Sequence, residues 1–231
     1  MSAFDGILFD KDGTLFDFEA TWSGWTYGIV GDFSNGDATV AERLGDAVGY
    51  DFAQRCFRPN SVAIAGTPLQ IAEALGELLP GQTPESVLQH LDASAALAQQ
   101  HPTVPLAPLF EGLRARNLRL GIATNDSEMP TRAHLSSAGI IELFDFIAGS
   151  DSGHGGKPAP GQLLAFAQEF ELDPARCVMV GDSAHDLSAG RAAGMACVAV
   201  LTGLSTADDL RPLADVVLPD IGHLPVWLDA G

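Results

Sequence analysis

The chain has 231 residues, of which 46% are apolar and 18% charged, a composition typical of a globular protein with a sizeable core. Its formal net charge of −18 argues against nucleic acid or an anionic membrane as a partner. No apolar stretch reaches the roughly 18 residues of a membrane span, and the first residues lack the basic region of a signal peptide, so we expect a cytoplasmic protein.

The first predicted strand, residues 4–9, leads directly into Asp10-Lys11-Asp12-Gly13-Thr14-Leu15. Two carboxylates at the end of a buried strand are costly to fold unless a metal, a cation or a proton compensates their charge. Taken alone, Asp12-Gly13 is equally compatible with an ordinary β-turn. The interpretation of this cluster therefore depends on what lies further along the chain.

Roughly 90 residues follow Leu15 before another strand is predicted, and they have helical spacing. Thr83 and Pro84 mark one helix start, as a cap and a first-turn proline. The segment ends at a proline-rich joint, residues 101–105. We predict a helical insert that crosses to the rest of the chain near residues 16–17 and 102–105, with helices at 18–30, 38–48, 68–79 and 84–100.

Beyond the joint, apolar runs alternate with segments of helical spacing. Near-continuous apolar strands that alternate with helices indicate a parallel sheet covered on both faces. We therefore predict an α/β fold with a Rossmann-like parallel sheet core, residues 1–15 and 104–231, and an inserted all-helical domain, residues 16–103. The later strands are expected at 118–123, 146–148, 177–180, 197–201 and 216–218, and the helices between them at 129–138, 161–170 and 184–193.

Three further polar sites follow the later strands. Thr124-Asn125-Asp126 offers a hydroxyl and backbone N–H groups that can hold phosphate oxygens, although Thr124 alone is more simply explained as a helix cap. Lys157, one of only two lysines, lies in a Gly/Pro loop and suits a phosphoryl oxygen, but a solvated loop lysine is an equal alternative.

The last site is Gly181-Asp182-Ser183-Ala184-His185-Asp186. Asp182 and Asp186 are one helical turn apart, which favours oxygen ligands for a hard cation, with Mg²⁺ the natural choice. Asp182 could instead cap the helix. His185 points elsewhere on the helix and is interpreted as a surface residue.

The order of these motifs resembles that of the haloacid dehalogenase-like superfamily, and within it the phosphoglycolate-phosphatase-like branch with a helical cap after the first motif. The resemblance spans Asp10 to Asp186, and Asp-x-Asp-Gly-Thr is its most specific element. It implies that Asp10 is the nucleophile and a metal ligand, and that Asp12 is the acid/base with its carbonyl on the metal. Thr124 and Asn125 are similar to the phosphate-holding pair, Lys157 to the lysine that steadies Asp10 and the phosphoryl group, Asp182 to the Mg²⁺ ligand, and Asp186 to a second partner of the metal site.

An acid at Asp12 favours phosphoryl transfer, because a leaving alkoxide needs a proton and a halide does not. The expected activity is Mg²⁺-dependent hydrolysis of a small phosphorylated metabolite through an aspartyl-phosphate, with phosphoglycolate as the default substrate and the chain acting as a monomer or a homodimer. A phosphomutase of the β-phosphoglucomutase kind remains the alternative. A receiver-type signalling domain or a phosphometabolite-binding domain is more remote.

Two smaller expectations concern the insert and the cysteines. Arg55 and Arg58 are candidate contacts for an anionic substrate tail, although solvated arginines are the favoured interpretation. The aromatic residues of the insert are interpreted as its core: Trp22, Trp25 and Tyr27. The cysteines are expected to be thiols in a reducing compartment, buried in the case of the last two: Cys56, Cys177 and Cys197.

Overall fold

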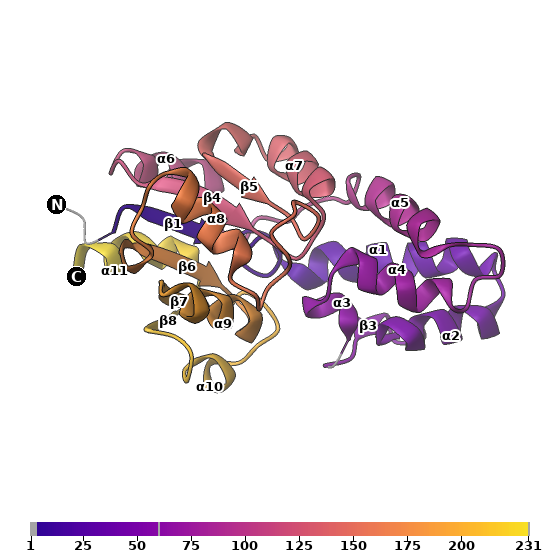
Figure 1. The fold of residues 1–231 in the computed structure, drawn as a ribbon. Helices are drawn as coiled ribbons and strands as arrows, with labels where there is room; N and C mark the ends of the chain where they lie inside the picture. Colours follow the sequence, from indigo (N-terminus) through magenta and orange to yellow (C-terminus); the bar gives the residue numbers. More distant parts are fainter. Residues whose placement is uncertain (1–3, 60, 231) are drawn as a thin grey trace.

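The computed structural model describes residues 4–59 and 61–230. Its centre is a six-stranded sheet in the order β5-β4-β1-β6-β7-β8, in which every neighbouring pair is parallel (Figure 1). This is the predicted α/β, Rossmann-like core. The strands are β1 (Gly6–Phe9), β4 (Arg119–Ala123), β5 (Phe146–Ala148), β6 (Cys177–Gly181), β7 (Ala196–Val200) and β8 (Val216–Leu218).

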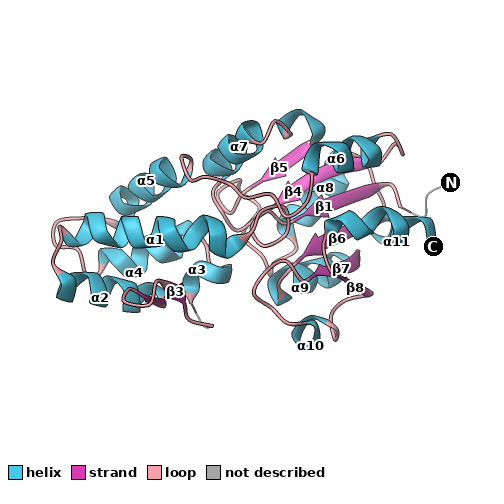
Figure 2. Ribbon diagram, turned by 180° about the vertical axis from the view of Figure 1, so that it is seen from behind, coloured by secondary structure: helices cyan, strands magenta, loops and turns pink. Residues whose placement is uncertain are grey.

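Helices cover both faces of the sheet (Figure 2). On one face, α6 (Leu106–Arg114), α7 (Glu128–Ser137) and α11 (Leu224–Ala230) pack against the side chains of Ile7 and Phe9. On the other face, α8 (Gly161–Glu169) and α9 (Ala184–Ala193) pack against Leu8. Because successive residues of a strand point to opposite faces, both sets must be apolar, which explains the continuous apolar runs in the sequence.

The insert forms a second body beyond the carboxyl ends of the strands (Figure 1). It has its own apolar core, to which Leu44, Tyr50 and Leu75 belong. Its elements are α1 (Phe18–Ser34), α2 (Ala38–Val48), the two-stranded hairpin β2 (Tyr50–Asp51) and β3 (Cys56–Phe57), α3 (Val62–Ala65), α4 (Pro68–Gly76) and α5 (Pro84–Ala95).

The two crossings to the insert lie side by side. Phe16 and Pro102 form a β-bridge, and the Asp17 N–H donates to the carbonyl of His101 at 2.8 Å. Asp17 also caps α1 through its side chain. We propose residues 16–103 as the extent of the insert, and the pairing of its two crossings supports this proposal.

The insert differs from the prediction at its helix ends. Helix α1 passes through Gly31 and continues to Ser34, because buried Ile29 and Val30 anchor it, and it stops at Asn35 in the left-handed conformation. Helices α4 and α5 end earlier than predicted. The hairpin was not predicted, nor were the helices α3, α6, α10 (Ala207–Leu210) and α11.

Two of the three cysteines lie in the core. Cys177 and Cys197 are buried free thiols, as expected, and burial raises the pKa of each to about 11. Such thiols are poor nucleophiles at neutral pH. Across residues 4–59 and 61–230, no helix combines the length and apolar character needed to cross a bilayer.

Candidate active site

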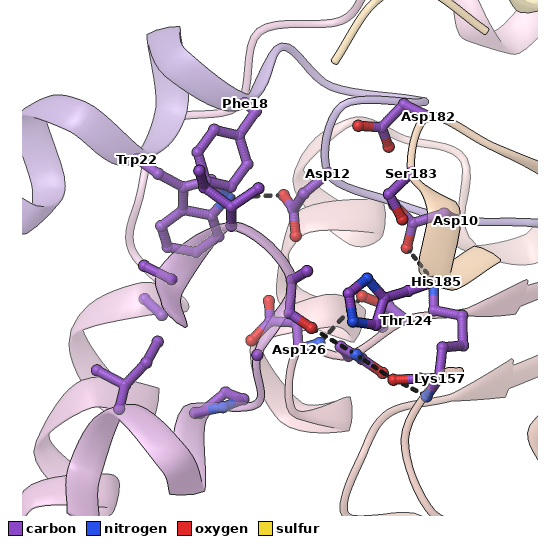
Figure 3. Close-up of a pocket in the computed structure, with 18 of the residues that line it drawn as sticks. Asp10, Asp12, Phe18, Trp22, Thr124, Asp126, Lys157, Asp182, Ser183 and His185 are labelled. Carbon is purple, nitrogen blue, oxygen red and sulfur yellow. Dashed lines mark hydrogen bonds and ion pairs between the residues drawn. The ribbon is translucent and has the colours of Figure 1, made fainter. Parts of the chain in front are cut away.

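The predicted site residues follow neighbouring strands. Because β1 pairs with both β4 and β6, Asp10 lies between the loops that carry Thr124 and Asp182. Lys157 comes from the loop between β5 and α8. All seven predicted residues line one pocket of about 100 Å³, whose other wall comes from the insert: Asp10, Asp12, Thr124, Asn125, Lys157, Asp182 and Asp186. Figure 3 shows this pocket and labels most of them.

Lys157 is the central cation of this pocket. Its Nζ donates to Oδ1 of Asp10 and to Oδ1 of Asp186, both at 2.6 Å. Burial by itself lowers the pKa of Lys157, but the charges of the two carboxylates outweigh burial and hold the pKa above its usual value. The residue is only 5% exposed, so it is not a solvated loop lysine.

Three carboxylates lie around this ammonium, and two of them, Asp10 and Asp186, accept hydrogen bonds from it. One oxygen from each of Asp10, Asp182 and Asp186 lies within 4.8 Å of the others. Burial raises the pKa of Asp10 to about 7, with Lys157 opposing the shift and Asp186 adding to it. Burial, and then the charges of Asp186 and Asp10, raise the pKa of Asp182 well above its usual value. The cluster is therefore short of positive charge.

The helix-cap alternatives for Thr124 and Asp182 do not hold. Ser127 occupies the N-cap position of α7, and Ser183 that of α9. In the latter, Asp186 Oδ2 accepts from both the N–H and the hydroxyl of Ser183, while its Oδ1 accepts from Lys157. Asp186 thus ties the helix start to the lysine, and Asp182 remains open to the pocket.

Gly13 allows the first motif to approach Asp182. Its φ is +82°, and a Cβ at this position would lie 2.5 Å from Asp182 Oδ2, so no larger residue fits without a shift. The hydroxyl of Thr14 donates to Asp182 Oδ1 at 3.2 Å, and the hydroxyl of Thr202 donates to the carbonyl of Gly13 at 2.6 Å. Gly13 and Thr14 of the first motif therefore position Asp182, which follows the neighbouring strand β6.

Asp12 is held by a cation and by an indole. Lys11 Nζ lies 2.7 Å from Asp12 Oδ2 and 3.1 Å from Asp126 Oδ2. The Nε1–H of Trp22, on α1 of the insert, donates to Asp12 Oδ1 at 2.8 Å (Figure 3). Burial lowers the pKa of Lys11, but Asp12 and Asp126 reverse this effect and raise it. The acid/base candidate is thus fixed from both halves of the molecule.

His134 extends this network to α5 of the insert. Burial, and then the charge of Lys11, lower the pKa of His134 to about 4, so the ring is neutral. Since an ammonium only donates, Nδ1 accepts from Lys11 at 3.1 Å, and Nε2–H donates to the carbonyl of Ala95 at 2.7 Å. Burial raises the pKa of Asp126 to about 6, with Lys11 opposing the shift.

Asn125 connects the lysine loop with the insert. Its side-chain oxygen accepts from the Lys157 N–H at 2.7 Å. Its side-chain nitrogen donates to the carbonyls of Lys157 and Ala65. The hydroxyl oxygen of Thr124 accepts from the Asp126 N–H, which leaves its hydrogen for a bound oxygen. Thr124 and Asn125 both line the pocket. The Asn125 side chain, however, is bonded to the backbone of the loop that carries Lys157.

Two sequence interpretations need correction. Trp22 does belong to an apolar cluster of the insert, but it also lines the pocket and bonds to Asp12, which the core interpretation missed. His185, interpreted as a surface residue, is half-buried and also lines the pocket, so it is not merely a surface residue. The sequence feature that could have indicated this contact is the position of Trp22 in the first helix after the Asp10–Thr14 motif.

Residues 4–194 match the family model of the haloacid dehalogenase-like hydrolases, and the chain belongs to this family. It is therefore a hydrolase and not a receiver-type signalling domain. It is 28% identical to a phosphoglycolate phosphatase of Nitrosococcus oceani, over 89% of this chain and 87% of that protein. It is 26% identical to a fructose-1-phosphate phosphatase of Escherichia coli, over 84% and 95%. A HAD phosphatase of Thermococcus onnurineus has the same fold, with a TM-score of 0.70 at 21% identity over 97% of both chains.

Proposed function

We propose that the protein is a Mg²⁺-dependent phosphatase that hydrolyses a small phosphorylated metabolite through an aspartyl-phosphate on Asp10. One observation carries this proposal. Asp10 lies at a parallel-sheet edge with Lys157 and two further carboxylates on one side, while Asp12 is fixed separately by Lys11 and Trp22. The phosphatase relatives support the reaction class, and the phosphoglycolate phosphatases among them make phosphoglycolate a substrate to test first.

The acidic cluster fits a magnesium ion. Its donors are carboxylate oxygens, which a hard cation prefers, and the excess of carboxylates over lysine is the charge that Mg²⁺ would balance. Asp10 and Asp182 would hold the ion, with the Asp12 carbonyl, and Asp186 would support them. When bound, the ion supplies positive charge to the phosphoryl oxygens.

The protein's own residues account for the remaining chemistry. Asp10 Oδ1 accepts from Lys157, so we assign Oδ2 the attack on phosphorus, which forms the Asp10–phosphorus bond and breaks the ester bond. Asp12 gives a proton to the departing alcohol oxygen, and then takes one from the water that hydrolyses the aspartyl-phosphate. Lys157 and the Thr124 hydroxyl hold phosphoryl oxygens, since the reaction depends mainly on positioning and charge.

The direct test is to incubate the protein and Mg²⁺ with a panel of phosphate monoesters and to measure the inorganic phosphate that is released. We expect turnover of at least one small ester, and none when EDTA replaces Mg²⁺. Absence of turnover across the whole panel would contradict the proposed function.

Magnesium should stabilise the protein in a pH-dependent way. At a Mg²⁺ concentration about 100 times Kd, binding contributes about 2.7 kcal/mol, which corresponds to a rise in Tm of about 5–10 °C for a chain of this size. The pKa of Asp10 is raised from 3.8 to about 7, so metal-free folded protein binds more protons than unfolded protein between about pH 4 and 7. The stability that protonated Asp10 contributes to the metal-free protein is therefore lost as the pH rises through this window.

Mg²⁺ must displace these protons, so we expect a small Tm increase at pH 5 and the full increase at pH 8. Differential scanning fluorimetry at both pH values, with NaCl at matched ionic strength as control, measures the effect. Asp182→Asn should reduce it. An equal Tm increase at both pH values would argue against metal binding by this cluster.

A further inference from the structure

Most of the pocket wall that the insert contributes is apolar, with Asp92 as its charged residue. Phe18 and Trp25 come from α1, Ile64 from α3, and Leu91 from α5. The two indole N–H groups of this wall are already used, since Trp22 donates to Asp12 and Trp25 to the hydroxyl of Ser94. Apart from Asp92, the described side chains of this wall therefore offer a leaving group apolar surface and no unused indole donor.

The described lining of the pocket offers no spare cation for a substrate tail. Among its described lining residues, Lys157 is the one lysine or arginine, and it is bonded to Asp10 and Asp186. The candidate arginines of the insert lie elsewhere: Arg55 stacks on Tyr27 at 4.0 Å, and Arg58 pairs with Asp46 at 2.5 Å. His185 lines the pocket from the core side, in the first turn of α9.

Asp92, on α5, is the charged residue that the insert contributes to the described lining. Its Oδ1 is buried without a hydrogen-bond partner among the described residues. A carboxylate here repels an anionic tail and can accept a hydrogen bond from a hydroxyl of the leaving group.

We propose, on the basis of the phosphatase function above, that the substrate is the phosphate monoester of a small uncharged alcohol with an apolar face. Esters with a carboxylate in the leaving group, phosphoglycolate included, are poor substrates. A carboxylate against this wall would lose its hydration without gaining an ion pair, and burial of an unpaired charge is strongly unfavourable.

The sharpest test compares phosphoglycolate with isobutyl phosphate. The two leaving groups have the same branched shape. Glycolate carries a carboxylate where isobutanol carries an uncharged isopropyl group. We expect kcat/KM at pH 8 with Mg²⁺ to be higher for isobutyl phosphate by about 10²-fold or more, because the carboxylate is left unpaired. Glycolate is the better leaving group chemically, so the intrinsic reactivity works against the expected result.

A pair of variants on α4 tests the cause. Ile71→Arg places a guanidinium in the pocket wall, where it can pair with the carboxylate of phosphoglycolate. The ratio of kcat/KM for isobutyl phosphate to kcat/KM for phosphoglycolate should therefore fall by about 10-fold or more. Leu69→Arg makes the same substitution type two residues away, on an exposed side chain that is 47% accessible, and should leave the ratio unchanged. If Ile71→Arg does not fold, Asp92→Asn provides the second variant, and it should also lower the ratio.

The outcomes separate this inference from the proposed function. If phosphoglycolate is hydrolysed as efficiently as isobutyl phosphate, or better, the inference is overturned and the phosphatase function stands. If neither these two esters nor any other in the panel is hydrolysed, the proposed function itself fails.

Discussion

Asp10→Asn should reduce phosphatase turnover by about 10³-fold or more, because an amide oxygen is a far weaker nucleophile towards phosphorus than a carboxylate. The side chain keeps its shape and can still accept from Lys157, which retains Asp186 as a charged partner. The variant also removes one of three clustered carboxylates. We therefore expect the metal-free Tm to stay within a few degrees of wild type, so that the loss is chemical and not a loss of fold.

Initial rates with the best ester of the panel, and Tm by scanning calorimetry, measure the two effects. Glu111→Gln is a matched control, since it makes the same change of charge on an exposed residue of α6 and should keep full activity. The intermediate gives an independent readout: acid-quenched wild type should carry a phosphoryl group on the peptide that contains Asp10, and the variant should carry none. Wild-type activity in fresh Asp10→Asn would remove Asp10 from the nucleophile role.

The core and the strand-end residues were predictable because they follow from local rules. A strand buried on both faces must be apolar throughout, so β1, β4 and β6 are visible as runs in the sequence. In a parallel sheet their carboxyl ends meet at one edge, and this places Asp10 near Thr124 and Asp182 without any knowledge of side-chain packing.

The contacts between the two halves could not be predicted in this way. Lys11 was noted as one of two lysines, but its partner His134 is 123 residues away and has no spacing that marks it. The apolar ring of Trp22 fits the core of the insert, as predicted. Its N–H reaches Asp12 only because of the way α1 lies against the edge of the sheet. Such pairings are set by the docking of the insert, for which hydrophobic periodicity carries no signal.

Lys157→Met should impair both stability and turnover, since it removes the ammonium and keeps most of the side-chain volume. Asp10, Asp182 and Asp186 would then face one another without the Lys157 ammonium that now pairs with two of them. Loss of one partner from a buried ion pair costs about 3–5 kcal/mol, which corresponds to a fall in Tm of about 6–20 °C for a chain of this size. Turnover by the folded variant should fall by about 10²-fold or more, because one charge on the phosphoryl oxygens is missing.

The pH dependence of this destabilisation identifies its cause. Without Lys157 the clustered carboxyls gain protons more readily in the folded state, so the Tm deficit in EDTA should be largest at pH 8 and shrink towards pH 5. Mg²⁺ should recover part of the Tm at pH 8 by replacing the missing charge, while turnover stays low because the ion cannot also replace the hydrogen bond to Asp10 Oδ1. Arg43→Met, an exposed residue of α2, makes the same change of net charge and should alter neither property. A pH-independent deficit would mean that Lys157 acts by packing, and a variant as stable as wild type at pH 8 would show that the carboxylates do not depend on this cation.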